Sequence, residues 1–151
     1  MKTDSIAVYF QDDHTRLEAI YHEFQAVKHT DPARAAACFA EFKAGLERHI
    51  VWEEEILFPG FESRTGMRDA GPTAVMRMEH ARIKQFLHDI AQKLAQHDVA
   101  TDAEEAGLQQ TLADHNWKEE QILYPAIDDM LPPADRHGVF ARMGVATGAA
   151  R

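Results

Sequence analysis

Two segments of the sequence repeat a spacing of histidine and glutamate that could hold a metal ion. The segment at 49–59 reads HIVWEEEILFP, and the segment at 115–125 reads HNWKEEQILYP, an offset of 66 residues. In each segment a glutamate follows the histidine by four residues, and these pairs are His49 with Glu53 and His115 with Glu119. Residues four apart are neighbours on one face of an α-helix, so each pair can present two ligands together.

The same offset relates a second pair of segments, and each of these contributes a single histidine. DHTRLEAIYHEF at 13–24 lies over EHARIKQFLHDI at 79–90, so His14 corresponds to His80. The chain is therefore a duplication of a two-segment unit, and each unit offers one lone histidine and one His-x-x-x-Glu pair.

These polar residues share helical stripes with large apolar residues, which predicts that they face a core. The six are His14, His49, Glu53, His80, His115 and Glu119. A single histidine on such a stripe is most often a core residue hydrogen-bonded to backbone. Without metal, each of the four histidines and two glutamates would need its own hydrogen-bond partner or counter-charge in the core. Divalent metal ions would compensate for all six.

A centre of two metal ions fits this ligand set better than a single ion. Half of the six candidate ligands come from each repeat, which suits a pseudo-twofold site with bridging glutamates. Mixed nitrogen and oxygen donors favour iron, with manganese or zinc as alternatives. The pattern contains no thiolate, which argues against a closed structural zinc site. The remaining alternative is a metal-free bundle in which the repeated residues are relics.

The order of a lone histidine, a His-x-x-x-Glu pair, a second lone histidine and a second pair resembles the hemerythrin-like (HHE cation-binding) proteins over about residues 10–130. The resemblance implies an all-α fold, an antiparallel up-down-up-down four-helix bundle. It also implies a non-haem di-iron centre, bridged by carboxylates and by an oxo or hydroxo group. The implied ligands are His14 and His49 for one iron, His80 and His115 for the other, and Glu53 and Glu119 as bridges.

One position departs from the oxygen carriers of that family. Those proteins carry a second histidine four residues after the lone histidine of the third helix, and Lys84 stands there in this chain. The repeat partner of Lys84 is Glu18. Glu18 could be a further ligand or a base beside the ligands, and Lys84 a cation that offsets negative charge. Alternatively, both side chains reach solvent.

A second ambiguity concerns the acidic residues next to the candidate ligands. Glu54 and Glu120 each follow a histidine by five residues, which is about 140° around an α-helix, so the fourth residue has the better ligand geometry. Glu120 remains an alternative ligand, because oxygen-carrying relatives use a carboxylate five residues after a histidine on the last helix. Glu54 and Glu55 are expected on a solvated face.

The expected function is that of a non-haem di-iron protein that interacts with O2, NO or peroxide in a redox, iron or nitrosative stress response. An iron-sensing or iron-storage module and an oxygen-binding protein are the alternatives. An enzymatic role stays open, because the sequence shows no pattern of an organic nucleophile or acid–base pair. Without metal, at least one of the two glutamates is expected to hold a proton, since like charges in a dry core disfavour joint ionisation.

The length of 151 residues and 45% apolar content predict one domain spanning 1–151, with the bundle at about 11–127. The net charge of −9 disfavours nucleic acid and anionic membranes as partners. A single cysteine, Cys38, excludes an intrachain disulfide and fits a reducing compartment. No signal peptide or membrane span is evident, so a cytoplasmic location is expected.

Helix signals divide the chain into four long segments and a short one. Asp12 or Asp13 could cap the first helix, and Asp31 followed by Pro32 predicts the start of the second. A loop is expected at 60–71, and the tail at 146–151 should be mobile. The predicted helices are 11–29, 32–57, 71–97, 102–123 and a short C-terminal helix at 134–143.

Overall fold

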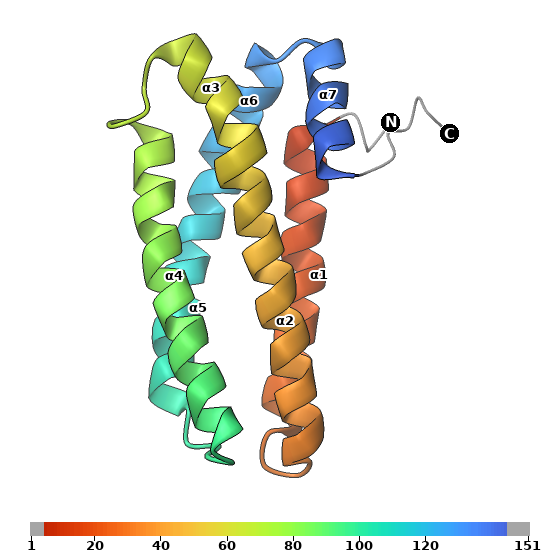
Figure 1. Cartoon of the computed structure of the whole chain (residues 1–151), viewed down its shortest axis with the longest axis vertical. Coiled ribbons are helices and arrows are strands. Elements are labelled where there is room, and N and C mark those ends of the chain that lie inside the picture. The colour runs from red at the N-terminus through yellow and green to blue at the C-terminus, as the bar shows by residue number, and fades with distance from the viewer. Residues whose placement is uncertain (1–4, 145–151) are drawn as a thin grey trace.

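The computed structural model describes residues 5–144, which fold into a bundle of helices without a strand in that range (Figure 1). The elements in chain order are α1 (Ile6–Val27), α2 (Pro32–Trp52), the π-helical turn η2 (Glu53–Leu57), α3 (Phe58–Thr65), α4 (Pro72–Ala95), α5 (Asp102–Lys118), the π-helical turn η3 (Glu119–Leu123), α6 (Tyr124–Met130) and α7 (Pro133–Met143). The tail expected to be mobile lies outside the described residues. No helix in the described range is long and apolar enough to cross a membrane.

Four long helices, α1, α2, α4 and α5, form the body of the bundle (Figure 1). α1 joins α2, and α4 joins α5, at one end of the molecule, while α3 leads into α4 at the other end. α2 continues through η2 into α3, and α5 continues in the same way through η3 into α6. The short helix α7, which was predicted, lies beside the end of the bundle where α1 begins.

The first helix begins earlier than the sequence indicated. Ser5 caps it by accepting a hydrogen bond from the Val8 N–H, and Ile6 and Phe10 in its first turns are fully buried. Asp13, a predicted cap, instead lies inside the bundle. The N-terminus of the second helix is as predicted, with Asp31 accepting from the Arg34 N–H.

The predicted loop at 60–71 is shorter in the structure, because α3 continues to Thr65. Pro59 sits in the first turn of α3 and cannot donate a helical hydrogen bond, yet it follows the π-helical turn without ending the helix. Two arginines bond to carbonyl groups of this turn. Arg77 donates to the Glu54 carbonyl (3.1 Å), and Arg142 donates to the Glu55 carbonyl (3.5 Å).

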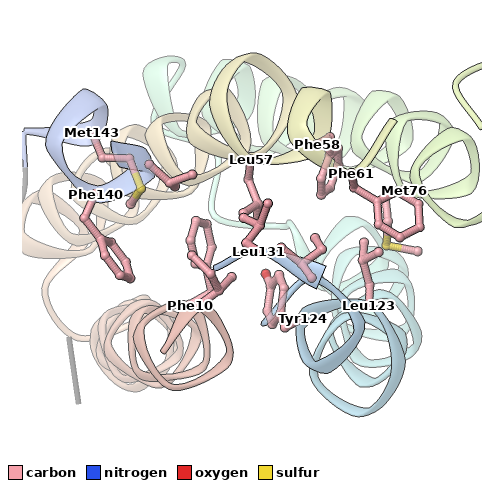
Figure 2. Packing of buried hydrophobic residues seen from close by; sticks show 13 residues of the cluster. Phe10, Leu57, Phe58, Phe61, Met76, Leu123, Tyr124, Leu131, Phe140 and Met143 are labelled. Atoms are coloured by element: carbon pink, nitrogen blue, oxygen red, sulfur yellow. The ribbon is translucent and has the colours of Figure 1, made fainter. Parts of the chain in front are cut away.

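Two clusters of buried apolar side chains occupy the two ends of the bundle interior. Figure 2 shows the cluster where α3, α6 and α7 meet, with Phe10, Leu57, Tyr124 and Phe140 directed towards one another. The other cluster consists of Leu17, Tyr21, Phe24, Ala35, Phe39, Phe42, Leu46, Ile50, Ile83, Leu87, Ile90, Leu94 and Leu108. Along each long helix, the candidate ligands fall between residues of the two clusters.

Asp128 on α6 fastens the start of α1 to the bundle. Its carboxylate accepts hydrogen bonds from the Ser5 hydroxyl (2.9 Å) and from the backbone N–H groups of Ile6 (2.7 Å) and Ala7 (2.9 Å). These N–H groups have no partner within the helix, and a carboxylate at a helix N-terminus is stabilising.

Replacement of this carboxylate tests the fastening. Asp128→Ala should lower the free energy of unfolding by about 1–2 kcal/mol, the usual effect of losing a helix cap. Asp129→Ala, at the exposed neighbouring position, is the matched control and should change it little. Urea denaturation of both variants measures the difference, and equal midpoints would contradict the role given to Asp128.

Candidate metal centre

The structure brings all six candidate ligands into one layer between the two apolar clusters. Each is buried, and Glu53 and Glu119 have no exposed surface. They come from six elements, with His14 on α1, His49 on α2, Glu53 on η2, His80 on α4, His115 on α5 and Glu119 on η3.

Each glutamate lies between histidines from both halves of the layer. The four closest contacts are His14 Nε2 to Glu119 Oε1 at 3.2 Å, His115 Nε2 to Glu119 Oε2 at 3.2 Å, His49 Nε2 to Glu53 Oε2 at 3.5 Å, and His80 Nε2 to Glu53 Oε1 at 3.0 Å. Thus the two oxygens of one carboxylate face different histidines, the arrangement that a bridging carboxylate requires.

The histidine rings are grouped in the same pairs that the family resemblance implies. The ring centroids of His14 and His49 are 4.7 Å apart, and those of His80 and His115 are 4.8 Å apart. Ligand atoms of His14, His49 and Glu119 lie within 4.8 Å of one another, as do those of His80, His115, Glu53 and Glu119.

A second layer of carboxylates binds the other nitrogen of every ring. The pairs are His14 Nδ1 with Glu120 (2.7 Å), His49 Nδ1 with Asp13 (2.8 Å), His80 Nδ1 with Glu54 (2.7 Å) and His115 Nδ1 with Glu79 (2.9 Å). A carboxylate on Nδ1 fixes the ring orientation and leaves Nε2 to face the centre, as is usual for metal-binding histidines.

This second layer corrects two expectations from the sequence. Glu54 is half-buried against His80 and is not on a solvated face, whereas Glu55 is exposed as expected. Glu120, the alternative ligand, contacts the outer nitrogen of His14 and not the centre. The sequence signal for this layer was the same offset of 66 residues, which relates Asp13 to Glu79 and Glu54 to Glu120.

The π-helical turns explain how consecutive glutamates both face inwards. In η2 the Phe58 N–H bonds to the Glu53 carbonyl, and in η3 the Tyr124 N–H bonds to the Glu119 carbonyl, five residues back in each case. Such a turn accommodates one residue more than an α-helical turn, and π-turns recur at functional sites. As a result Glu54, which an α-helix would turn away from the face of His49, reaches His80.

Tyr124 is the residue of the centre that the sequence did not identify. Its hydroxyl donates to Glu53 Oε2 (2.5 Å) and lies 2.9 Å from Glu119 Oε1, 3.3 Å from His49 Nε2 and 3.4 Å from His14 Nε2. The repeat places Phe58 at the equivalent position, and its ring stacks on His80. The exchange of Phe for Tyr within the repeat was the only signal available.

The other pair in which the repeats differ lies outside the centre. Glu18 and Lys84 are both exposed, as the solvent alternative predicts. The charge of Lys84 nevertheless helps to lower the pKa of Glu54, after the larger effect of the hydrogen bond from His80 and against the effect of burial. Lys84 therefore acts on the centre through a residue of the second layer.

Without a metal ion, the positive charges of protonated histidines in this layer compensate the negative charges of its glutamates. Burial disfavours a charged imidazole, but Glu119 and Glu120 outweigh it and raise the pKa of His14 to about 10. Glu53 and Glu54 likewise overcome burial and raise the pKa of His80 to about 9. The pKa of Glu53 is well below its usual value, because the charge of His49 and hydrogen bonds outweigh burial. For Glu53 the expectation that the carboxylate holds a proton is therefore wrong, since the neighbouring imidazoles hold it.

Several buried atoms of the layer still lack a suitable hydrogen bond. Among the described residues, Glu53 Oε1, His80 Nε2 and Glu119 Oε2 have no partner in hydrogen-bonding geometry, although they lie close to one another's side chains. Native proteins leave few such groups unsatisfied. One imidazole nitrogen and two carboxylate oxygens that are unpaired and converge in a buried layer fit a metal ion well.

A family model for the hemerythrin HHE cation-binding domain matches residues 5–127. The chain belongs to this family. The match covers both repeats and every candidate ligand of the hemerythrin domain. Comparison with curated proteins and with solved structures found no significant match to either. The family match and the buried cluster of histidines and glutamates together indicate that the hemerythrin domain binds metal.

The histidine pKa values predict how the metal-free domain responds to pH. The pKa values of His14 and His80 rise on folding from 6.5 to about 10 and about 9, so folding is favoured while they are protonated. Their stabilising contribution is complete below pH 6.5 and is lost as the pH rises through 9 to 10.

After metal removal with a chelator, the melting temperature should fall over this interval. The metal-loaded domain is the control, because bound imidazoles are already neutral and its melting temperature should change less. A metal-free melting temperature that is constant or rises over this interval would contradict the charge assignment.

Proposed function

We propose that this hemerythrin domain holds two iron ions in a single carboxylate-bridged centre. The proposed ligands are His14 and His49 for one ion, His80 and His115 for the other, and Glu53 and Glu119 as bridges. The observation that carries the proposal is that the two oxygens of each buried glutamate face histidines of different pairs. The antiparallel up-down course of the four long helices, which the family implies, is part of this proposal.

The donor set supports iron over the other candidates. Imidazole and carboxylate without thiolate suit iron, manganese and zinc, and carboxylate-rich sites in the cores of helical bundles are typical of di-iron and di-manganese proteins. The free thiol Cys38 suits a reducing setting, and we therefore keep a cytoplasmic location within the proposal.

Bound iron would supply open coordination positions for O2, NO or peroxide, and the protein controls what reaches them. The carboxylates on each Nδ1 hold the rings in place, and the two apolar clusters exclude water from both ends of the layer. On this basis we propose a redox- or gas-reactive role, within a redox, iron or nitrosative stress response.

Access to the centre is possible through a groove between α1 and α5. The groove has a volume of about 540 Å³ and is lined by residues of α1, α2, α5 and η3, including His14 and Glu120. Its wall also includes Trp117, which is 60% exposed, so the groove reaches from solvent to the half of the centre that contains His14. We propose that a small molecule reaches this half of the centre along the groove, past His14.

Iron sensing is the second candidate, and one observation weakens it. A sensor that unfolds on losing iron needs uncompensated buried charge in the metal-free state. Here the imidazoles, whose pKa values are raised, compensate the carboxylates without an ion. We therefore expect the bundle to stay folded without iron, with reduced stability, and favour the reactive role over a sensor that works by unfolding.

The iron content of a double variant tests the centre. Purified protein reconstituted with ferrous iron should bind two ions per chain, and Glu53→Gln with Glu119→Gln should lose both, because the neutral amide removes the charge shared by the ions. Glu55→Gln, at an exposed position of the same acidic run, is the matched control and should retain both. Elemental analysis measures the content, and full occupancy in the double variant would refute the proposal.

Filling the groove tests the access route. Ala113 is exposed and lines the groove, so Ala113→Trp should slow NO binding to the ferrous domain about tenfold, equivalent to about 1.4 kcal/mol in the barrier. Ala44→Trp, at an exposed α2 position outside the groove lining, should leave the rate unchanged. Stopped-flow absorbance gives the rates, and equal rates in both variants would exclude this route.

A further inference from the structure

The hydroxyl of Tyr124 occupies a position among the ligand atoms of one half of the centre. Within 3.4 Å of it lie Glu53 Oε2, Glu119 Oε1, His49 Nε2 and His14 Nε2. These four atoms are the ones that face the half with His14 and His49. The phenol ring itself belongs to the apolar cluster at the end of the bundle (Figure 2), while its oxygen lies among the ligand atoms of the layer.

The distances around this oxygen are those expected between ligands of a common ion. Nitrogen and oxygen ligands lie about 2.0–2.2 Å from such metals, so adjacent ligands at right angles are roughly 3.0 Å apart. The Tyr124 oxygen is 2.5–3.4 Å from all four atoms, which bracket that value.

We propose that the Tyr124 oxygen is a direct ligand of the ion held by His14 and His49, and that the second ion has no such ligand. The inference rests on the proposed function and assigns a residue to it. In the protein alone, burial and the charges of Glu119 and Glu53 raise the pKa of Tyr124, so the phenol keeps its proton. On coordination the proton leaves to solvent, and the cation compensates the phenolate charge.

Among residues 5–144, no hydroxyl takes the equivalent position in the other half of the centre. Phe58 takes the place of Tyr124 in the repeat, and its ring lies parallel to that of His80 with centroids 6.0 Å apart. The guanidinium of Arg77 lies 5.7 Å from the Phe58 ring centroid. An anionic oxygen donor stabilises the higher charge of ferric iron by Coulomb attraction. The ion beside Tyr124 is therefore the one that favours the ferric state, although the two ligand sets otherwise match.

Spectroscopy of the ferric domain tests the ligand directly, since a phenolate bound to ferric iron gives a visible charge-transfer band. Wild-type protein with two ferric ions per chain should show this band, and Raman excitation within it should enhance tyrosine ring modes. Tyr124→Phe should abolish both features, and Tyr21→Phe should keep them, because Tyr21 belongs to the apolar cluster at the far end. Phe58→Tyr should increase the band by placing a second phenol in the equivalent position.

The outcomes separate this inference from the function on which it rests. Failure of the wild type to bind iron refutes the proposed centre itself. If the wild type binds two ferric ions but shows no enhanced tyrosine modes, Tyr124 is not a ligand, and the proposed di-iron centre is unaffected. If Tyr124→Phe loses iron, wild-type protein labelled with ring-deuterated tyrosine still tests the ligand. Its enhanced Raman modes must shift relative to unlabelled protein if Tyr124 binds the ion.

Discussion

Two carboxylates without any contact with solvent determine how this bundle is built. Glu53 and Glu119 lie in the middle of the interior, where an ionised group needs a counter-charge, a donor or a metal. Four imidazoles surround them, and each imidazole is in turn held by a carboxylate on its outer nitrogen. The charges of the layer are thus arranged in alternation from the centre outwards, and the apolar clusters close it at both ends.

The backbone adapts to this layer at two matching places. An uninterrupted α-helix could direct either the buried glutamate (Glu53 or Glu119) or its neighbour inwards, but not both. The π-helical turns η2 and η3 begin at Glu53 and Glu119. Pro59 and Pro125, two residues after the end of each turn, cannot donate helical hydrogen bonds. We infer that the proline and the wider turn are linked, and that the EEEILFP and EEQILYP segments encode a backbone irregularity as well as ligands.

The sequence predicted the features that depend on spacing within one helix and on the repeat. The six candidate ligands, the helical class and the start of the second helix follow from such local patterns. The contacts of Glu54 and Glu120 did not, because regular helical geometry assigns them to the wrong face until the π-helical turn is known. The early start of α1 was missed because its fastening to Asp128 joins residues far apart in the chain.

The duplicated sequence gives the two halves of the centre matching candidate ligands, but the residues around those ligands differ between the halves. Tyr124 and the groove both belong to the half with His14, whereas Phe58 closes the half with His80. The groove and the Tyr124 hydroxyl therefore lie at the same half of the centre. If the two halves were chemically equivalent, the exchange of Tyr124 for Phe58 between the repeats would have no effect.

The central claim is that Glu53 and Glu119 bridge two ions, and the distance between the ions tests it most directly. X-ray absorption at the iron edge of the fully loaded domain should show an iron neighbour at roughly 3.5–4 Å or somewhat closer, the separation typical of bridged pairs. Iron surrounded only by light ligand atoms, with no iron neighbour at this range in protein that holds two ions per chain, would contradict the account.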